Sequence, residues 1–236
     1  MQNPEQVHIV IFTGGEAPEY EKTRLYWKTH PQADYVIAAD SGLETCASYA
    51  FSPCVIMGDF DSIQDKALLD YYKDDIKVPF DADKDFTDTE LAVEKAWEIA
   101  EKLKKTPFIT LVGGDGGRID HLLNIYDSFS KEKHVHSWLC NMQCIYYLQK
   151  DSEAEINGLK AQDYVSVARL SKAYTGGKAV SSGLEWESTM FRKEGMPSIS
   201  NRISSEYSKA RLPVKIKAKE ESLLLILPYN AVVTCN

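Results

Sequence analysis

The chain has 236 residues, of which 44% are hydrophobic and 26% are charged, so its composition is that of a globular protein and excludes a disordered chain. Its 35 acidic and 27 basic side chains give a formal net charge of −8, which argues against a protein that binds nucleic acid, because such proteins present basic patches to the phosphates. The length is sufficient for one large domain or two small ones.

The first part of the chain alternates between predicted strands and predicted helices. Apolar and β-branched runs predict strands at residues 7–15, 35–40, 54–60, 76–80, 108–114 and 135–141. Helices are predicted from Ser41, which we expect to cap the first of them, over 63–74, from Thr87 to about Leu103, and from about Arg118 to Ser130. Thr87 and Glu90 match the capping-box pattern. This alternation predicts a mainly parallel, Rossmann-like α/β sheet with helices on both faces.

After about residue 143 the pattern changes. Short apolar runs at 144–149, 164–170, 178–187, 213–218 and 222–228 predict strands separated by Gly, Pro and Ser, and there is no convincing long helix. This pattern is typical of a small all-β domain, either a sandwich or an open barrel. We therefore predict an α/β domain over 1–142 and a smaller, sandwich-like β domain over 143–236.

Polar residues gather directly after the predicted strands of the first domain. Asp40 follows one strand, Asp59 and Asp61 follow the next, and the segments 81–88 and 113–120 follow two more. In parallel sheets covered by helices, the ligand binds beyond the carboxyl ends of the strands, near a topological switch point. We therefore expect these four clusters to converge on one edge of the sheet and to form an active site.

The segment from Asp59 to Asp88 is acidic, because it contains ten Asp and four Lys but no Glu or Arg, a net charge of −6. In the turn 58–62, Asp59 and Asp61 are separated by one residue. Their carboxylates are hard oxygen ligands that suit Mg²⁺. The alternative is a turn that caps the start of a helix, because Asp and Ser also have that role. In the loop 81–88, four carboxylates surround one lysine. A charge run is usually a solvated loop, but carboxylates this close repel one another unless a cation intervenes, so a metal or metal–phosphate site is favoured.

A glycine-rich turn, 113–117, joins a predicted strand to a predicted helix. Glycines allow backbone N–H groups to approach a phosphate, and the helix N-terminus favours an anion. The turn matches neither of the common phosphate-binding motifs, so a plain turn is the alternative. Arg118 is suited to bind a phosphate with two hydrogen bonds. His121 is either part of this site or a partly buried helix residue.

The five cysteines are odd in number and scattered, so a disulfide framework is not expected. Cys140 and Cys144 have no second pair at zinc-site spacing, which favours two buried thiols over a metal site. No apolar run approaches the roughly 20 residues that span a bilayer, and the first residues lack the features of a signal peptide. We expect a reduced, cytoplasmic protein that does not bind membranes.

Trp186 and the stretch Ser198–Asn201 read by themselves as a core aromatic residue and a polar turn. With the motifs above, however, they complete an ordered set that resembles the thiamine pyrophosphokinase (thiamine diphosphokinase) family over nearly the whole chain. Ser41 stands where many members have glycine, and Lys84 where some have glutamine. The matching segments are Ala39–Gly42, Ile56–Ser62, Asp83–Asp88, Gly113–His121, Gly183–Trp186 and Ser198–Asn201.

The resemblance implies an N-terminal catalytic domain that binds ATP and Mg²⁺ and a C-terminal β domain that binds thiamine. It implies a homodimer with active sites at the subunit interface, where thiamine is held between the N-terminal domain of one chain and the C-terminal domain of the other. The implied reaction transfers the pyrophosphoryl group of ATP to the hydroxyl group of thiamine, giving thiamine diphosphate and AMP.

The resemblance also implies roles for single residues. We expect Asp59, Asp61 and Asp88 to hold Mg²⁺, with Asp40 and Asp85 as further catalytic carboxylates. The residues expected to bind the nucleotide or its phosphates are Ser41, Gly42, Ser62, Lys84, Thr87, Gly116, Arg118, Asp120 and His121. The residues expected to bind thiamine are Trp186, Ser198, Ser200 and Asn201. Two other functions stay open: another Mg²⁺-dependent transferase that uses a nucleotide, and a non-catalytic sensor of thiamine or nucleotides on the same fold.

Overall fold

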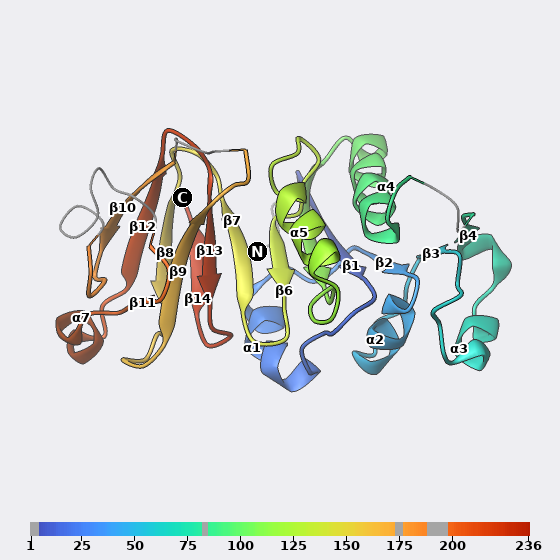
Figure 1. Ribbon diagram of the computed structural model, residues 1–236, viewed down its shortest axis with the longest axis horizontal. Helices are drawn as coiled ribbons and strands as arrows, with labels where there is room; N and C mark the ends of the chain where they lie inside the picture. Colours follow the sequence, from blue (N-terminus) through green and yellow to red (C-terminus); the bar gives the residue numbers. More distant parts are fainter. Residues whose placement is uncertain (1–4, 82–84, 173–176, 188–197) are drawn as a thin grey trace. The chain divides into compact units, whose positions relative to one another are not determined.

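The computed structural model describes residues 5–81, 85–172, 177–187 and 198–236 (Figure 1). The chain divides into two compact units, Met1–Asn141 and Met142–Asn236, which are called unit 1 and unit 2 below. Lys84, one of the residues expected to bind phosphate, lies outside the described residues, and so does Asp83 of the same acidic loop.

The main sheet of unit 1 is parallel, as predicted. Its strands are β1 (Gln6–Phe12), β2 (Tyr35–Ala39), β3 (Val55–Gly58), β4 (Lys77–Pro79), β5 (Thr106–Val112) and β6 (Ser137–Leu139). They lie in the order β6-β5-β1-β2-β3-β4, and every neighbouring pair runs parallel. The chain thus proceeds outward from β1 to β4 and then returns to place β5 on the other side of β1.

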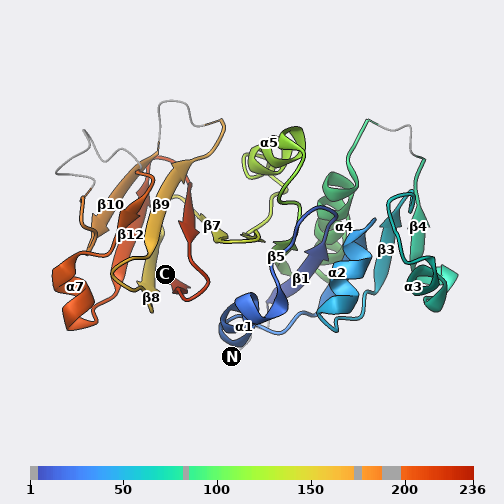
Figure 2. The same cartoon turned by 60° about the horizontal axis from the view of Figure 1, so that its bottom comes forward.

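Helices cover both faces of this sheet. They are α1 (Tyr20–Thr29), α2 (Gly42–Ser48), α3 (Lys66–Tyr71), α4 (Asp88–Leu103) and α5 (Ile119–Ser128), with a 3₁₀ turn, η1 (Asp74–Ile76), before β4. Crossovers between parallel strands are right-handed, so the helices that connect β1 to β4 share one face. The crossovers of α4 and α5 run the opposite way across the sheet, which puts these helices on the other face (Figures 1 and 2).

Side chains from both faces of the sheet form the core of unit 1. On one face the ring of Phe12 lies 5.4 Å from the rings of Tyr49 and Phe51. On the other face Leu111 and Ile125 line a cavity of about 430 Å³ between α4 and α5. Because both faces are covered, the central strands are buried along almost their whole length, which explains their near-continuous apolar runs.

The two predicted helix caps have different outcomes. The capping box of α4 is confirmed: Thr87 Oγ1 accepts the N–H of Glu90 at 3.2 Å, and Glu90 Oε2 accepts the N–H of Thr87 at 3.0 Å. The prediction that the side chain of Ser41 caps α2 was wrong, because this side chain makes no capping hydrogen bond. Its backbone is already helical, with φ −60° and ψ −8°, whereas a capping residue is normally extended.

Helix α1 has no counterpart in the prediction. Its buried residues are Thr23 and Tyr26 rather than a stripe of aliphatic side chains, so the hydrophobic pattern of a helix is weak. The hydroxyl of Tyr26 bonds to Thr110 Oγ1 at 2.8 Å and to Ser137 Oγ at 2.6 Å. Polar groups of the sheet therefore hold this helix, and they are distant in sequence.

Unit 2 is mainly antiparallel β-structure. Its elements are β7 (Cys144–Leu148), β8 (Glu153–Asn157), β9 (Tyr164–Arg169), β10 (Lys178–Ser182), β11 (Asn201–Arg202), α7 (Ser205–Ala210), β12 (Val214–Lys219), β13 (Leu223–Leu227) and β14 (Val232–Cys235). Strands β11, β9, β13 and β7 are neighbours in that order, and β10-β12-β8-β14 form a separate four-stranded sheet. The predicted fold class is confirmed; the short helix α7 and the strands β8, β11 and β14 were not predicted.

Two smaller expectations concern thiols and membranes. All five cysteines lie in the described residues and form no disulfide; Cys144 is buried, as expected, whereas Cys140 is only half-buried. Within the described ranges, every helix is too short or too polar to cross a bilayer.

Candidate active site

A pocket of about 680 Å³ lies at the carboxyl ends of the strands of unit 1. The connections that leave β1 and β5 run in opposite directions across the sheet, so the switch point lies between these two strands. The pocket is lined by residues at or after the ends of β1, β2, β3 and β5, by the first turn of α4 and by the first two turns of α5. Loops that are far apart in sequence therefore meet in one place.

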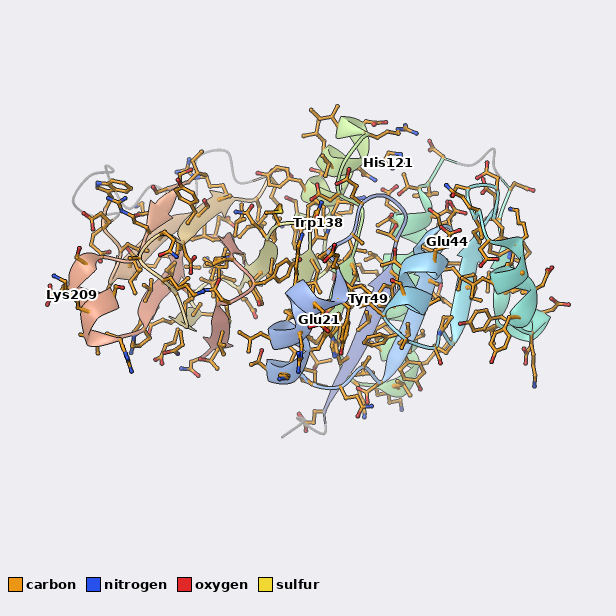
Figure 3. All side chains as sticks on the ribbon, turned by 90° about the horizontal axis from the view of Figure 1, so that it is seen from below. Glu21, Glu44, Tyr49, His121, Trp138 and Lys209 are labelled. Atoms are coloured by element: carbon orange, nitrogen blue, oxygen red, sulfur yellow. The ribbon has the colours of Figure 1, made fainter. Side chains whose placement is uncertain are left out.

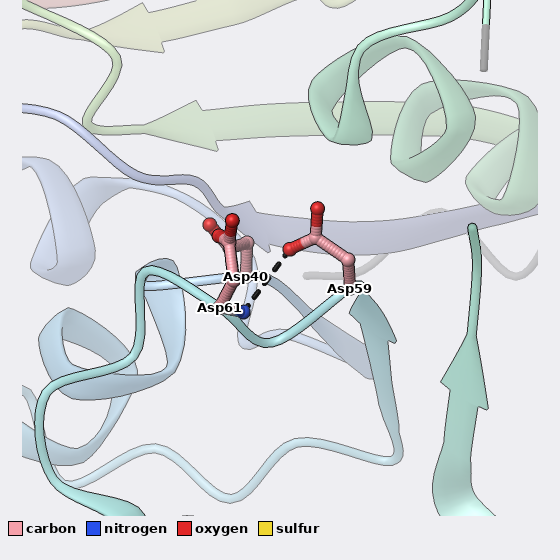
Figure 4. A group of neighbouring side chains, drawn as sticks. All are labelled: Asp40, Asp59 and Asp61. Atoms are coloured by element: carbon pink, nitrogen blue, oxygen red, sulfur yellow. Dashed lines mark hydrogen bonds between the residues drawn. The ribbon is translucent and has the colours of Figure 1, made fainter. Parts of the chain in front are cut away.

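Three aspartates form an acidic group in this pocket (Figure 4). Asp40 follows β2, Asp59 and Asp61 follow β3, and one carboxylate oxygen from each lies within 4.8 Å of the others. The pairing of Ala39 with Met57 in the neighbouring parallel strands brings the two strand ends together. Asp61 is also held to Asp59, because the Asp61 N–H donates to Asp59 Oδ1 at 3.1 Å.

The backbone around the acidic group is bent sharply. Asp40 has a φ of 50° and Phe60 a φ of 63°, which are left-handed conformations that few non-glycine residues adopt. Gly58 has a φ of 139°, and a Cβ at this position would lie 3.2 Å from the Cβ of Asp40. A glycine is therefore required here for the strand ends to approach closely. Such strained conformations are concentrated at functional sites.

The acidic group is short of hydrogen-bond donors. Ser62 Oγ donates to Asp40 Oδ2, but Asp40 Oδ1 is buried and has no hydrogen-bond partner within the described part of the chain. The pKa of Asp61 is raised, first by its hydrogen bond with Asp59 and then by the charges of Asp59 and Asp40. A divalent cation would satisfy the unpartnered oxygen and relieve this repulsion, and carboxylate oxygens are ligands that suit Mg²⁺.

The first turn of α4 forms another wall of the pocket. Asp88 and Thr89 line it, and Thr89 Oγ1 lies 2.6 Å from Thr13 Oγ1 at the end of β1. Lys131 donates to Glu90 Oε1 at 2.8 Å. Burial raises the pKa of Glu90, but hydrogen bonds from Lys131 and the capping threonine outweigh it and lower this pKa to about 2. The start of α4 is thus fixed in position, and the positive end of its helix dipole favours anions.

The glycine-rich turn is shaped by Asp115. Its backbone forms a bridge with Glu16, with N–H···O distances of 2.7 and 3.1 Å. Its carboxylate accepts the N–H of Gly116 at 2.8 Å and the N–H of Asn141 at 3.0 Å. These contacts join the loops that follow β1 and β5, so the switch point is closed by direct hydrogen bonds.

Arg118 and Asp120 form an ion pair at the mouth of the turn. Arg118 Nε donates to Asp120 Oδ1 at 3.2 Å and Nη2 to Oδ2 at 2.5 Å, while both side chains remain exposed. The hydrogen bond from Arg118 lowers the pKa of Asp120 to about 2. His121 is exposed on α5 and lines the pocket, so it is not a buried helix residue (Figure 3).

In unit 2, an exposed tryptophan lies beside a buried amide. Trp186 is 39% exposed and is therefore not a core residue, whereas Asn201 is 1% exposed. Asn201 Oδ1 accepts the N–H of Trp186 at 3.2 Å, and its Nδ2 donates to the carbonyl of Trp186 at 2.7 Å. The guanidinium of Arg202 lies 5.1 Å from the centre of the Trp186 ring. Ser200 is exposed and Ser198 is half-buried.

Residues 25–139 match the family model described as thiamin pyrophosphokinase, catalytic domain. Residues 25–139 of this chain belong to the thiamin pyrophosphokinase family. The resemblance inferred from the sequence motifs is thereby confirmed. Because the matched model describes a catalytic domain, the match implies an enzyme of this family.

Solved structures of thiamin pyrophosphokinases share the fold of this chain. The thiamine pyrophosphokinase from Bacillus subtilis has a TM-score of 0.66 and 19% identity, covering 94% of this chain and 98% of that one. The thiamin pyrophosphokinase from Candida albicans has a TM-score of 0.66 and 16% identity over 95% and 90% of the two chains. The yeast thiamin pyrophosphokinase has a TM-score of 0.62 and 15% identity over 97% and 88%. At these identities the likeness establishes the fold, and no curated protein sequence matches significantly.

Most of the residues that the family resemblance singled out in unit 1 line the pocket. Asp85 does not line it and is exposed, and Asp120 reaches it only through its ion pair with Arg118. Gly42 is buried instead, where a Cβ would lie 2.3 Å from the carbonyl oxygen of Phe12. The residues that line the pocket are Asp40, Ser41, Asp59, Asp61, Ser62, Thr87, Asp88, Gly116, Arg118 and His121.

Other pocket residues were missed by the sequence analysis. Thr13 to Glu16 carried a usable signal, because a buried strand that ends in two glycines is a typical place for a ligand in a parallel sheet. Ile125 carried none, since only the packing of α5 decides which of its apolar residues face the pocket. The missed residues are Thr13, Gly14, Gly15, Glu16, Thr89 and Ile125.

Proposed function

We propose that this protein is a thiamine diphosphokinase, which transfers the pyrophosphoryl group of ATP to the hydroxyl group of thiamine and yields thiamine diphosphate and AMP. The observation that carries the proposal is the pocket of unit 1, in which an acidic group, a glycine-rich turn and two helix N-termini lie together at the switch point. Membership of the thiamin pyrophosphokinase family supports the same activity.

The acidic group fits a magnesium ion, because its oxygens converge and one of them, Asp40 Oδ1, is buried without a hydrogen-bond partner in the described structure. Asp40, Asp59 and Asp61 would hold the ion, with Asp88 on the neighbouring wall of the pocket. Bound there with ATP, Mg²⁺ would neutralise the charge that develops on the AMP leaving group.

The task of the protein in such a transfer is mainly to position the phosphates. The backbone N–H groups of the glycine-rich turn and the side chain of Arg118 would bind them, and Lys84 is proposed as a further cation. As the thiamine oxygen attacks the β-phosphorus, the bond from this phosphorus to the bridging oxygen of AMP breaks. A carboxylate, Asp59 or Asp88, would accept the hydroxyl proton.

Trp186 is the proposed platform for the thiamine ring. A flat, cationic ring on the face of a tryptophan gains about 0.5–2 kcal/mol. Arg202 already places a positive charge over this ring, so the thiamine must use the other face or displace the guanidinium. Ser198 and Ser200 would contact the pyrimidine, whereas Asn201 would act through Trp186, whose backbone it holds.

The proposal includes a homodimer in which each thiamine contacts the catalytic domain of one chain and Trp186 of the other. Mixing two impaired variants tests it, at a thiamine concentration far below the KM, where Trp186→Ala is slow. Asp61→Asn and Trp186→Ala chains, when unfolded together and refolded, should form mixed dimers with one intact site, so the activity should exceed that of the two variants measured separately. If each subunit contains a complete site, mixing would give no such gain. We further propose a cytoplasmic location, which agrees with the lack of disulfides among the five cysteines, all of which the structure describes.

The direct test is to incubate the purified protein with ATP, thiamine and Mg²⁺ and to quantify AMP and thiamine diphosphate by chromatography. Formation of both in equal amounts, and its loss in Asp61→Asn, is the expected result. AMP without thiamine diphosphate would favour another nucleotide-dependent transferase. Binding of thiamine or ATP with no product in a single-turnover experiment would favour a sensor. Either result would refute the proposed activity.

A further inference from the structure

Glu44 bridges two segments of unit 1 that both contribute to the acidic group. It lies on α2, one turn after Asp40 (Figure 3). Its Oε1 atom accepts the N–H of Gln64 at 2.7 Å and the N–H of Asp65 at 2.9 Å. Glu44 is not itself one of the three converging carboxylates. Its side chain therefore binds backbone rather than the site that those carboxylates form.

The loop that Glu44 holds is the loop that carries Asp59 and Asp61. From Asp61 to Asp65 its side chains are exposed except that of Ile63, which is 1% exposed. An exposed loop with one buried side chain has little packing to fix it, so hydrogen bonds must define its conformation. The hydrogen bonds to Glu44 anchor its far end.

Helix α2 is a firm support for this anchor. Leu43 and Cys46 are fully buried, and Gly42 packs directly on the backbone of Phe12 in the central strand. A carboxylate on such a helix gives two charge-assisted hydrogen bonds, which are stronger than bonds between neutral groups. A further negative charge near three aspartates is unfavourable unless it makes strong contacts, and these two hydrogen bonds supply them.

We propose that Glu44 is a positioning residue, which holds the loop after β3 in register with Asp40 so that the three carboxylates converge before the cation arrives. This inference rests on the proposed function, because it requires that the acidic group binds a divalent cation. Groups that hydrogen-bond to metal ligands typically change metal affinity by about 10- to 100-fold when removed. Glu44 acts through the backbone of Gln64 and Asp65, so its effect should lie at the lower end of this range.

The experiment measures Mn²⁺ binding to the full-length protein by electron paramagnetic resonance of the free ion, without substrates and without an activity readout. We expect Glu44→Ala to raise the Kd for Mn²⁺ by about 10-fold. Glu44→Gln keeps an oxygen that accepts both N–H groups, so it should restore most of the affinity. Amide hydrogen exchange at Gln64 and Asp65 should accelerate in Glu44→Ala and much less in Glu44→Gln.

Glu187→Ala is the matched control. Glu187 Oε1 accepts two consecutive N–H groups in the same way, from Gly183 at 2.6 Å and Leu184 at 3.0 Å, but in unit 2. This variant should bind Mn²⁺ as the wild type does. If Glu44→Ala does not fold, Glu44→Asp replaces it, because the shorter side chain cannot keep both hydrogen bonds.

The outcomes separate the inference from the proposed function. In one outcome the wild type binds Mn²⁺ and Asp61→Asn does not, so the metal site stands. If the Kd of Glu44→Ala for Mn²⁺ is then within twofold of the wild-type Kd, the positioning role is refuted. If Glu44→Gln is as weak as Glu44→Ala, the charge of Glu44 matters rather than its hydrogen bonds, which also refutes the role. If the wild type and Asp61→Asn bind Mn²⁺ equally, the metal site itself is refuted and the inference falls with it.

Discussion

His136 makes the stability of unit 1 depend on pH. It immediately precedes β6, and its Nδ1 accepts the backbone N–H of Ile109 at 3.1 Å. Its ring lies 5.6 Å from that of Phe108 and 6.2 Å from that of Trp97. Burial, together with the charges of the nearby His134 and His8, lowers the pKa of His136 to about 3. Protonation at Nδ1 would also remove the acceptor that Ile109 uses.

The sign of the effect follows from this pKa. A histidine in an unfolded chain has a pKa of about 6.5, so the unfolded state takes up a proton as the pH falls below that value, whereas folded His136 does not. The stabilisation is therefore complete above about pH 6.5 and is lost as the pH falls toward about 3. Between pH 7.5 and 5.0 the loss is about 2 kcal/mol for this residue. His30, whose pKa burial lowers to about 4, contributes in the same direction.

The variant His136→Asn tests this reasoning, because asparagine keeps an acceptor near the position of Nδ1 but does not titrate. Urea unfolding is followed by tryptophan fluorescence at pH 7.5 and 5.0, and Trp27, Trp97 and Trp138 report on unit 1. The variant loses ring packing, which lowers its free energy of unfolding at both pH values. The quantity to compare is therefore the decrease in the free energy of unfolding from pH 7.5 to pH 5.0. We expect this decrease to be smaller in the variant than in the wild type by about 2 kcal/mol.

A control and a direct measurement complete the test. His121→Asn removes an exposed histidine and should leave the pH dependence of unfolding unchanged. Nuclear magnetic resonance of the His136 ring should show no titration between pH 7.5 and 5.0. If His136→Asn and the wild type lose equal free energy over this range, or if the ring titrates near pH 6.5, His136 is not a buried neutral group and the reasoning is refuted.

Three other substitutions test the site and the fold. Trp186→Ala should raise the KM for thiamine by between about 2- and 30-fold with little change in the KM for ATP, and an unchanged thiamine KM would remove the proposed stacking. Thr87→Ala removes the capping box with Glu90 and should lower the free energy of unfolding by about 1 kcal/mol in urea titrations; no loss would mean that the cap is dispensable. Gly42→Ala places a methyl group 2.3 Å from the carbonyl oxygen of Phe12, so the melting temperature should fall markedly, and an unchanged value would contradict the tight packing.

The sequence predicted those features of the fold that depend on local patterns. Burial on both faces gives the central strands continuous apolar runs, and α4 combines an apolar stripe with a capping box, so both were found. Helix α1 was missed because its buried face is made of Thr23 and Tyr26, which bond to Thr110 and Ser137. Contacts between residues 84 and 111 positions apart leave no trace in the local hydrophobic periodicity.

The membership of the acidic group shows the same limit. The resemblance implied Asp88 as the third metal ligand, with Asp40 as a further catalytic carboxylate. In the structure Asp40 lies beside Asp59 and Asp61, because β2 and β3 are neighbours in the sheet, and Asp88 lines the same pocket. Which strands are neighbours is a property of the whole fold, and no spacing along the chain determines it.

The acidic segment itself is divided among different tasks. Of its ten aspartates, Asp59, Asp61 and Asp88 line the pocket. Asp65 instead caps α3 by accepting the N–H of Leu68 at 3.0 Å, and Asp74 pairs with a lysine in an exposed ion pair. Charge density along the chain therefore does not locate the site by itself; the site lies where carboxylates follow directly on neighbouring strand ends.

In the same pocket, backbone N–H groups of a glycine-rich turn and an exposed arginine provide donors for an anion. A phosphate alone would be repelled by the carboxylates, and a cation alone would not use the anion-binding turn, so the pocket supports our proposal of a polyphosphate that carries a divalent metal.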